Sequence, residues 1–494
     1  MLNKLLKSLS LLLLLNLLIK PIWVLLVDRK VQLVIDAQWS VDSSITPYGL
    51  FVAVYSYTLW FNVILDLGIR NYHNTTLAKN NNLLASAYST YLPLKAILSF
   101  AYAGIMALAA LIVGEYLAYH VLFWCLVLNQ VLIGFTSFFR ATITGLGRYN
   151  TDSIISVIDR VIMLALAVPI FFTQLWNSYQ TIEAFVVLHT IAYAITTVVC
   201  LVVVLPHLKG LKLSPNFNNL GTTLKKTIPF ALLTLLMTIY IRSDFVMIEQ
   251  LLPNGAEKAG VYAKGYRILE AGTMFALLFG NLLLPAFSSI QTKKNELIQL
   301  IKSVAQLAMY PAIILSATAY LFREPLMQFY YPNCTIEVSD CFGLLMLNFI
   351  SVSAFFIFST ALTAAHKMRT LNSIALGGLA LNLILNFTLI PKIGIYGAIY
   401  ATLATQGLAS ILQILAVSKL YSIKIQPLFI IKFIIWLIPI IGLGHLLSLL
   451  GIGWVVQLSL YMLINFTFAI FLRLVDTRQL ILTLKHSRND NIAD

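Results

Sequence analysis

An apolar segment near the middle of the chain carries three charged side chains. Residues 228–252 are long enough to cross a bilayer, and they include "YIRSDFVMIEQ" with Arg242, Asp244 and Glu249. Charge at this depth in a membrane is unfavourable, so such residues are candidates for function. On a helix, Arg242 and Glu249 share a face, and Asp244 lies nearly opposite Arg242. These carboxylates could bind a coupling ion, and the arginine could bind an anion.

The next apolar segment, 262–287, continues the pattern with "YRILEAG". Arg267 and Glu270 are three residues apart and therefore share a helix face. A short connector makes the two helices antiparallel, which puts Asp244 and Glu270 at the same depth, roughly 12 Å below the outer boundary. The charges can then compensate one another across the helix pair. The alternative is a set of purely structural ion pairs.

Lys20 is a further candidate, because it lies in the middle of the first apolar segment, 8–27. The adjacent Pro21 should kink this helix. A lysine at this depth either pairs with a carboxylate or faces an aqueous cavity, and we favour the cavity.

Other charged residues lie nearer to the membrane boundary. Lys95, Asp159 and Arg160 fall in the inner parts of their segments, where we expect them to extend towards the interface. Asp66 and Arg70 end the second segment and are interpreted as interfacial.

No pattern for catalysis, a metal or a cofactor is present. His189 and His445 are isolated, and neither a nucleophile elbow nor a phosphate-binding loop occurs in its required context. Cys334 and Cys341 share one predicted external connector, where an oxidising compartment would permit a disulfide.

The composition identifies the class of protein. Of 494 residues, 60% are hydrophobic and 11% are charged, and the mean hydropathy is +0.87. A soluble chain carries about 25% charged residues. The net charge of +14 is spread over connectors, which argues against nucleic acid as a partner. We therefore predict an all-α polytopic membrane protein.

About fourteen segments have the length of a transmembrane helix. They are 8–27, 48–67, 88–113, 117–138, 154–173, 181–205, 228–252, 262–287, 300–322, 342–364, 372–390, 393–417, 427–449 and 452–473. Lysine and arginine concentrate in alternate connectors, including both termini, and the opposite connectors hold few. The positive-inside rule then predicts that both termini are cytoplasmic.

Two pairs of similar sequences indicate an internal repeat. "FRATITGLGRYNTDSI" (139–154) resembles "FSTALTAAHKMRTLNSI" (358–374), and "YGLFVAVYSY" (48–57) resembles "AGVYAKGYRI" (259–268). Both pairs are six segments apart, which predicts two parallel, pseudo-symmetric six-helix lobes. The predicted division is 1–210 for the N-terminal lobe, 211–424 for the C-terminal lobe, 425–475 for two extra helices and 476–494 for a cytoplasmic tail.

These features together resemble the oligosaccharide flippases of the multidrug/oligosaccharidyl-lipid/polysaccharide exporter superfamily. The resemblance rests on "PYGLF" at 47–51, "YIRSDFVMI" at 240–248 and "AGVYAKGYRILEA" at 259–271. It implies two lobes around a cationic cavity and alternating access, in a bacterial inner membrane. The implied substrate is an oligosaccharide on undecaprenyl diphosphate, used for O-antigen, capsule or exopolysaccharide.

The resemblance also assigns residues and partners. Arg242, Asp244, Arg267 and Glu270 fall at positions that line such cavities. Related lipid II flippases have arginines in their first helices, and the first helix here offers only Lys20. The implied partners are the lipid-linked oligosaccharide, membrane lipids and a polysaccharide polymerase.

Two other functions fit parts of the pattern. A drug exporter of the same superfamily would share the lobes, but such exporters usually have twelve spans and a less cationic cavity. A membrane glycosyltransferase or polymerase would use the same lipid carrier. It would need acidic catalytic residues on a large external loop, and no long loop is predicted.

Overall fold

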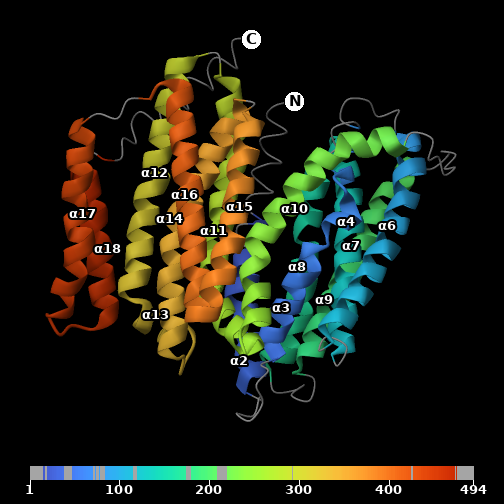
Figure 1. The fold of residues 1–494 in the computed structure, drawn as a ribbon, viewed down its shortest axis with the longest axis horizontal. Coiled ribbons are helices and arrows are strands. Elements are labelled where there is room, and N and C mark those ends of the chain that lie inside the picture. Colours follow the sequence, from blue (N-terminus) through green and yellow to red (C-terminus); the bar gives the residue numbers. More distant parts are fainter. Residues whose placement is uncertain are drawn as a thin grey trace. The chain divides into compact units, whose positions relative to one another are not determined.

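Helices form all the regular structure in the described part of the chain (Figure 1). The computed structural model describes residues 15–16, 19–37, 47–70, 73, 77, 84–114, 119–173, 180–208, 220–291, 293–365, 367–423, 427–472 and 474. Nine helices in these ranges are long and apolar enough to cross a membrane. Only helices satisfy their own backbone hydrogen bonds without closing into a barrel, which is why apolar runs adopt them in a bilayer. The prediction of an all-α polytopic membrane protein is confirmed.

The chain divides into two compact units, residues 1–260 and 261–494. Unit 1 contains η1 (Trp23–Asp28), α2 (Arg29–Ala37), α3 (Pro47–Trp60), α4 (Val63–Asp66), α6 (Leu84–Val113), α7 (His120–Gly145), α8 (Tyr149–Phe171), α9 (Ile182–Leu208) and α10 (Leu220–Leu251). Helix α9 packs against α7 and α8, and α10 packs against α3 and α4.

Unit 2 contains most of α11 (Gly255–Ser289), followed by α12 (Lys294–Leu321), α13 (Arg323–Tyr330), α14 (Ile336–Ala364), α15 (Met368–Ile393), α16 (Ile395–Tyr421), α17 (Pro427–Ser448) and α18 (Trp454–Phe471). Helix α14 packs against α12 and α16, while α17 and α18 form a pair beside α12. Trp436 Nε1 donates to Asn465 O at 3.1 Å and joins α17 to α18.

The helices agree with the predicted spans, and the units differ from the predicted lobes. Every predicted segment from 48–67 onward contains a helix. However, the boundary between the units falls after residue 260, so α10 belongs to unit 1, whereas the predicted boundary between the lobes falls after residue 210. The predicted tail, 476–494, lies outside the described residues.

The internal repeat has a counterpart in the geometry of the two units. Helix α7 ends at residue 145 and α8 begins at 149, while α14 ends at 364 and α15 begins at 368, a shift of 219 residues for both. The turns also match, since Arg148 N donates to Ile143 O at 3.0 Å and Lys367 N donates to Leu362 O at 2.9 Å. Each turn connects two spans that lie within one unit, so the same helix–turn–helix is built twice.

A second pair of equivalent bonds joins the next helices. Thr197 Oγ1 in α9 donates to Leu132 O in α7 at 3.3 Å, and Ser410 Oγ in α16 donates to Ser351 O in α14 at 2.8 Å. Because residues 132 and 351 again differ by 219, the bond joins equivalent helices in the two units. These matched contacts show that both units contain the same internal arrangement of helices.

Candidate functional site: cations on aromatic rings

Arg242 lies on aromatic rings inside unit 1. Its guanidinium carbon is 5.7 Å from the ring centre of Tyr55 on α3 and 5.9 Å from that of Phe245 on its own helix, α10. Phe51 stacks on Tyr55 at 6.0 Å. A cation over an aromatic face is stabilised by the ring quadrupole, most strongly where water is excluded. The rings of Tyr55 and Phe245 therefore stabilise the guanidinium of Arg242.

The two carboxylates of α10 are buried. Asp244 is 4% exposed and Glu249 is 9% exposed. The other two charged residues of the predicted cluster, Arg267 and Glu270, lie on α11 in unit 2. Charge compensation across α10 and α11 stays a prediction.

Lys20 lies within electrostatic range of an arginine and a carboxylate on α8. It is half-buried and interacts electrostatically with Asp159 and Arg160. One turn earlier, Asn16 Nδ2 donates to Ser156 Oγ at 2.9 Å and holds this face of the first helix on α8. The structure thus gives Lys20 a nearby carboxylate, one of the two alternatives left open by the sequence.

Arg160 lies near the middle of α8, and the expectation that it extends to the interface is wrong. Its guanidinium carbon is 5.8 Å from the ring centre of Trp23, Nη1 is 3.2 Å from Met163 Sδ, and the Tyr193 hydroxyl accepts a hydrogen bond from it. Trp23 begins the π-helix η1 directly after Pro21 and Ile22. A π-helical turn is wider than an α-helical one and is often found at functional sites.

We call Lys20, Trp23, Tyr55, Arg160, Tyr193 and Arg242 the unit 1 cluster. Tyr55 connects its two halves, since it lies under Arg242 and within electrostatic range of Arg160. Three cations among aromatic rings and a phenol can bind an anion and stack on a sugar ring. Within the described residues, no group of three His, Cys, Asp or Glu side chains could hold a metal ion.

Unit 2 has a smaller cation–aromatic contact. Arg267 is 4% exposed and its Nη1 donates to the Tyr331 hydroxyl. The Arg267 guanidinium carbon is 5.9 Å and the Lys264 ammonium nitrogen is 5.8 Å from the centre of the same ring. Lys264 is a cation that the sequence alone did not single out, because it is only the third residue of the predicted span, 262–287.

The two cysteines considered for a disulfide are free thiols in the structure. Cys334 Sγ lies 3.7 Å from Ser339 Oγ, and Cys341 Sγ lies 3.9 Å from Tyr262 O. Cys341 is the sixth residue of α14 and is fully buried, so its side chain packs against α11 and is not presented to the connector. The disulfide is therefore not formed.

Lys95 and Asp66 form an ion pair inside unit 1, which also corrects a prediction. Lys95 is 1% exposed, and its ammonium donates to Asp66 Oδ1 at 3.2 Å and to Leu65 O at 3.0 Å. Helix α4 ends beside this pair, because Leu67 and Gly68 adopt positive φ angles of 42° and 77°. Lys95 is therefore anchored in the protein and does not extend to the interface.

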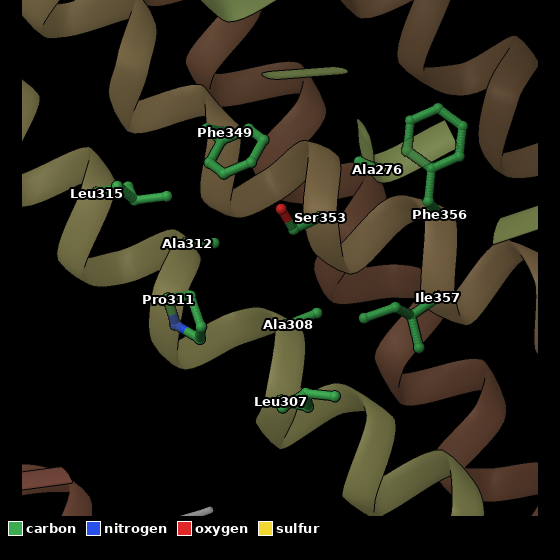
Figure 2. A pocket seen from close by; sticks show the side chains of 10 residues that line it. All are labelled: Ala276, Leu307, Ala308, Pro311, Ala312, Leu315, Phe349, Ser353, Phe356 and Ile357. Carbon is green, nitrogen blue, oxygen red and sulfur yellow. The ribbon is translucent and has the colours of Figure 1, made fainter. Parts of the chain in front are cut away.

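A cavity of about 310 Å³ lies in unit 2 between α11, α12 and α14 (Figure 2). Leu315, Phe349 and Phe356 are among its lining residues, and Ser353 is the only polar side chain among the described residues of the lining. A buried water needs two to four polar partners, so this lining favours hydrocarbon. It offers no cation for a phosphate, and we separate it from the charged site.

Comparison with known proteins decides the family. Residues 44–291, half of the chain, match the polysaccharide biosynthesis protein family. The chain belongs to this family. An uncharacterized membrane protein, MJ1375 of Methanocaldococcus jannaschii, is 26% identical over 197 residues, which is 40% of this chain. The match covers 46% of that relative's length.

Solved structures share the fold at low sequence identity. The lipid II flippase MurJ in an inward closed conformation has a TM-score of 0.57 and 13% identity, over 86% of this chain and 99% of its own. A MOP superfamily transporter from Pyrococcus furiosus, described as having a binding pocket of reverse polarity, has a TM-score of 0.54 and 12% identity, over 84% and 98%. The resemblance predicted from the sequence is confirmed for the family and the fold.

Proposed function

We propose that this protein moves an oligosaccharide linked to undecaprenyl diphosphate from the inner to the outer leaflet of the cytoplasmic membrane. Its family and its fold support the proposal. A diphosphate headgroup and its sugars are too polar to cross hydrocarbon unaided. The protein would supply a polar path by alternating access, for O-antigen, capsule or exopolysaccharide synthesis.

One observation carries the proposal: in the unit 1 cluster, Arg242 lies over the ring of Tyr55, and Lys20 lies within electrostatic range of Arg160. Arginine presents a planar fork that matches phosphate oxygens, and aromatic faces suit sugar rings. A protein that binds only uncharged, apolar molecules has no need of these cations. A transporter for an anionic glycolipid needs both cations for the phosphates and aromatic rings for the sugars.

The proposed roles follow the charges. Lys20, Arg242, Asp244, Arg267 and Glu270 would form the substrate-binding surface. Because Asp244 and Arg267 are each 4% exposed, substrate binding through them requires a conformation that uncovers them. Alternating access would provide such a conformation.

Ion coupling is assigned to three carboxylates. Asp244, Glu249 and Glu270 would bind the coupling proton or Na⁺, since a carboxylate in a low-dielectric site binds a cation far more strongly than one in water. Both termini would be cytoplasmic, and a polysaccharide polymerase would receive the product in the outer leaflet of a bacterial inner membrane.

The first experiment locates the lipid-linked repeat unit in a strain that lacks the gene. An impermeant sugar-modifying reagent reports the membrane face on which the intermediate accumulates. We expect accumulation on the inner face. Unpolymerised intermediate on the outer face would favour a polymerase instead, and normal processing together with increased drug sensitivity would favour a drug exporter.

Complementation of that strain tests the residues. We expect Arg242→Ala and Arg267→Ala to abolish export at normal protein levels, because each removes a guanidinium from the binding surface. The control is Arg148→Ala, which removes an exposed arginine at the start of α8. Export that survives both cavity substitutions would refute the assigned binding surface.

A further inference from the structure

Arg160 differs from the other arginines for which the structure gives a carboxylate partner. Arg140 Nε and Nη2 donate to the two carboxylate oxygens of Asp152 at 2.6 and 3.1 Å. Arg323 Nε donates to Asp340 Oδ1 at 2.6 Å. These two forks are occupied by close carboxylate contacts, the strongest kind that a protein offers.

Among the described residues, the fork of Arg160 has weaker partners. Its Nε is 3.9 Å from Asp159 Oδ2, beyond hydrogen-bonding distance. The other oxygen, Asp159 Oδ1, accepts the backbone N–H of Arg160 at 2.8 Å, which ties this carboxylate to the main chain. The thioether of Met163, the ring of Trp23 and the hydroxyl of Tyr193 complete the surroundings. All three are weak acceptors compared with a charged oxygen.

Charges of both signs surround Arg160. Lys20 lies within electrostatic range and repels it, and Asp159 and Asp28 attract it. Arg140 lies within electrostatic range of Lys20, and its own charge is already matched by Asp152. The Arg160 side chain is 24% exposed, so part of it is accessible. An added anion would form short contacts with the guanidinium and reduce its repulsion with Lys20, and these gains must exceed the repulsion from Asp159 and Asp28.

The fold itself has no need of this arginine. The shift of 219 residues that relates α8 to α15 places Leu379 at the position equivalent to Arg160. Leu379 is 5% exposed and packs as an ordinary apolar residue. The same helix position is therefore filled by leucine in unit 2 and by a cation in unit 1.

We propose that Arg160 binds a phosphate-type anion, with Lys20 as the second cation and the Tyr193 hydroxyl as a hydrogen-bond donor. Where the anion is the diphosphate of a lipid carrier, this site rests on the proposed function and makes Arg160 its headgroup-binding residue. A phosphate offers several charged oxygens to the fork, and Tyr193 can rotate its hydroxyl hydrogen towards them.

Equilibrium binding to the purified full-length protein tests the site. The probes are inorganic diphosphate and farnesyl diphosphate, which carries the same anion on a short isoprenoid. Trp23 lies against Arg160, so binding should change tryptophan fluorescence, and calorimetry gives an independent affinity. We expect saturable binding of diphosphate, weakened by at least about tenfold in Arg160→Gln and by less in Arg160→Lys, which keeps the charge but loses the fork.

Arg140→Gln is the matched control, since it removes a guanidinium from the same unit whose fork is already occupied by Asp152. We expect its affinity for diphosphate to be unchanged. Tighter binding of farnesyl diphosphate than of the inorganic anion indicates a lipid headgroup, and equal binding indicates the free anion. The inference fails if the wild type binds neither probe, if Arg160→Gln binds like the wild type, or if Arg140→Gln is weakened equally.

Misfolding of Arg160→Gln, failure of the proposed function and failure of the anion site can be distinguished by experiment. Arg160→Lys retains the positive charge at this position, so the ordering of the three affinities tests the site even if Arg160→Gln is recovered in low yield. If the deletion strain exports normally but diphosphate binding still depends on Arg160, the proposed function fails and this site stands. If export requires the protein and Arg160→Gln both binds and exports normally, only this site fails.

Discussion

The buried pair of Lys95 and Asp66 allows a stability prediction with a definite order of effects. The Lys95 side chain is 2% exposed and that of Asp66 is 27% exposed. Removing one partner of a buried ion pair costs about 3–5 kcal/mol, because it leaves an uncompensated charge. In Asp66→Ala the carbonyl of Leu65 still accepts from Lys95, and the lost carboxylate was partly solvated. We therefore expect a loss of about 2–3 kcal/mol, below that range.

Removing the charge itself should do far less harm. Lys95→Met keeps the volume of the side chain and needs no partner, so we expect a change of under about 1.5 kcal/mol. The double variant Lys95→Met/Asp66→Ala should then be more stable than Asp66→Ala alone. A second substitution that restores stability distinguishes a buried charge from a simple loss of contacts.

Unfolding of the purified protein by SDS in mixed micelles measures these free energies. The matched control is Glu296→Ala, which breaks the pair of Lys293 and Glu296 at 3.8 Å, where the side chains are 50% and 48% exposed. Such a surface pair contributes about 0–1 kcal/mol. The reasoning is refuted if Asp66→Ala is as harmless as Glu296→Ala, or if the double variant is no more stable than Asp66→Ala.

Three further predictions concern packing and thiols. Gly265→Ala should destabilise unit 2 by about 1–3 kcal/mol, because an added Cβ would lie 2.8 Å from Cys341 Sγ; Gly377→Ala, where nothing lies within 4 Å, should be neutral or stabilising in the same unfolding titration. Tyr461→Phe should cost about 1 kcal/mol by removing the hydroxyl that donates to Ile440 O at 2.6 Å, with Tyr400→Phe, on an exposed tyrosine, as the control. Unfolded, unreduced protein should titrate as four free thiols, and a count of two would show a disulfide.

The transmembrane helices could be predicted from the sequence because hydrocarbon leaves the backbone few choices. Apolar runs of the right length must become helices that satisfy their own hydrogen bonds. The repeat was also predictable, since "FRATITGLGRYNTDSI" and its counterpart specify the same helix ends in both units.

The depth of single charges was not predictable, because it depends on where each helix begins. Helix α8 begins at Tyr149, whereas the predicted span begins at residue 154. Five residues correspond to about 7.5 Å along a helix, which is enough to move Arg160 from the inner part of its span to the middle of the helix. Lys95 was missed for another reason, since its partner Asp66 is presented by a helix end with left-handed residues that hydropathy does not reveal.

A comparison of equivalent positions in the two units shows which charged residues the repeated helix arrangement does not need. The ion pair of Arg140 and Asp152 in unit 1 falls on Ser359 and Leu371 in unit 2, and the helices still end and begin at equivalent residues. The packing of α7 against α8 therefore does not depend on charge at these positions. Since a charge inside a membrane is unfavourable unless it is used, a cation that the repeated scaffold lacks elsewhere needs a separate reason. For Arg140 that reason is Asp152, which occupies its fork, and for Arg160 we infer that it is an anion.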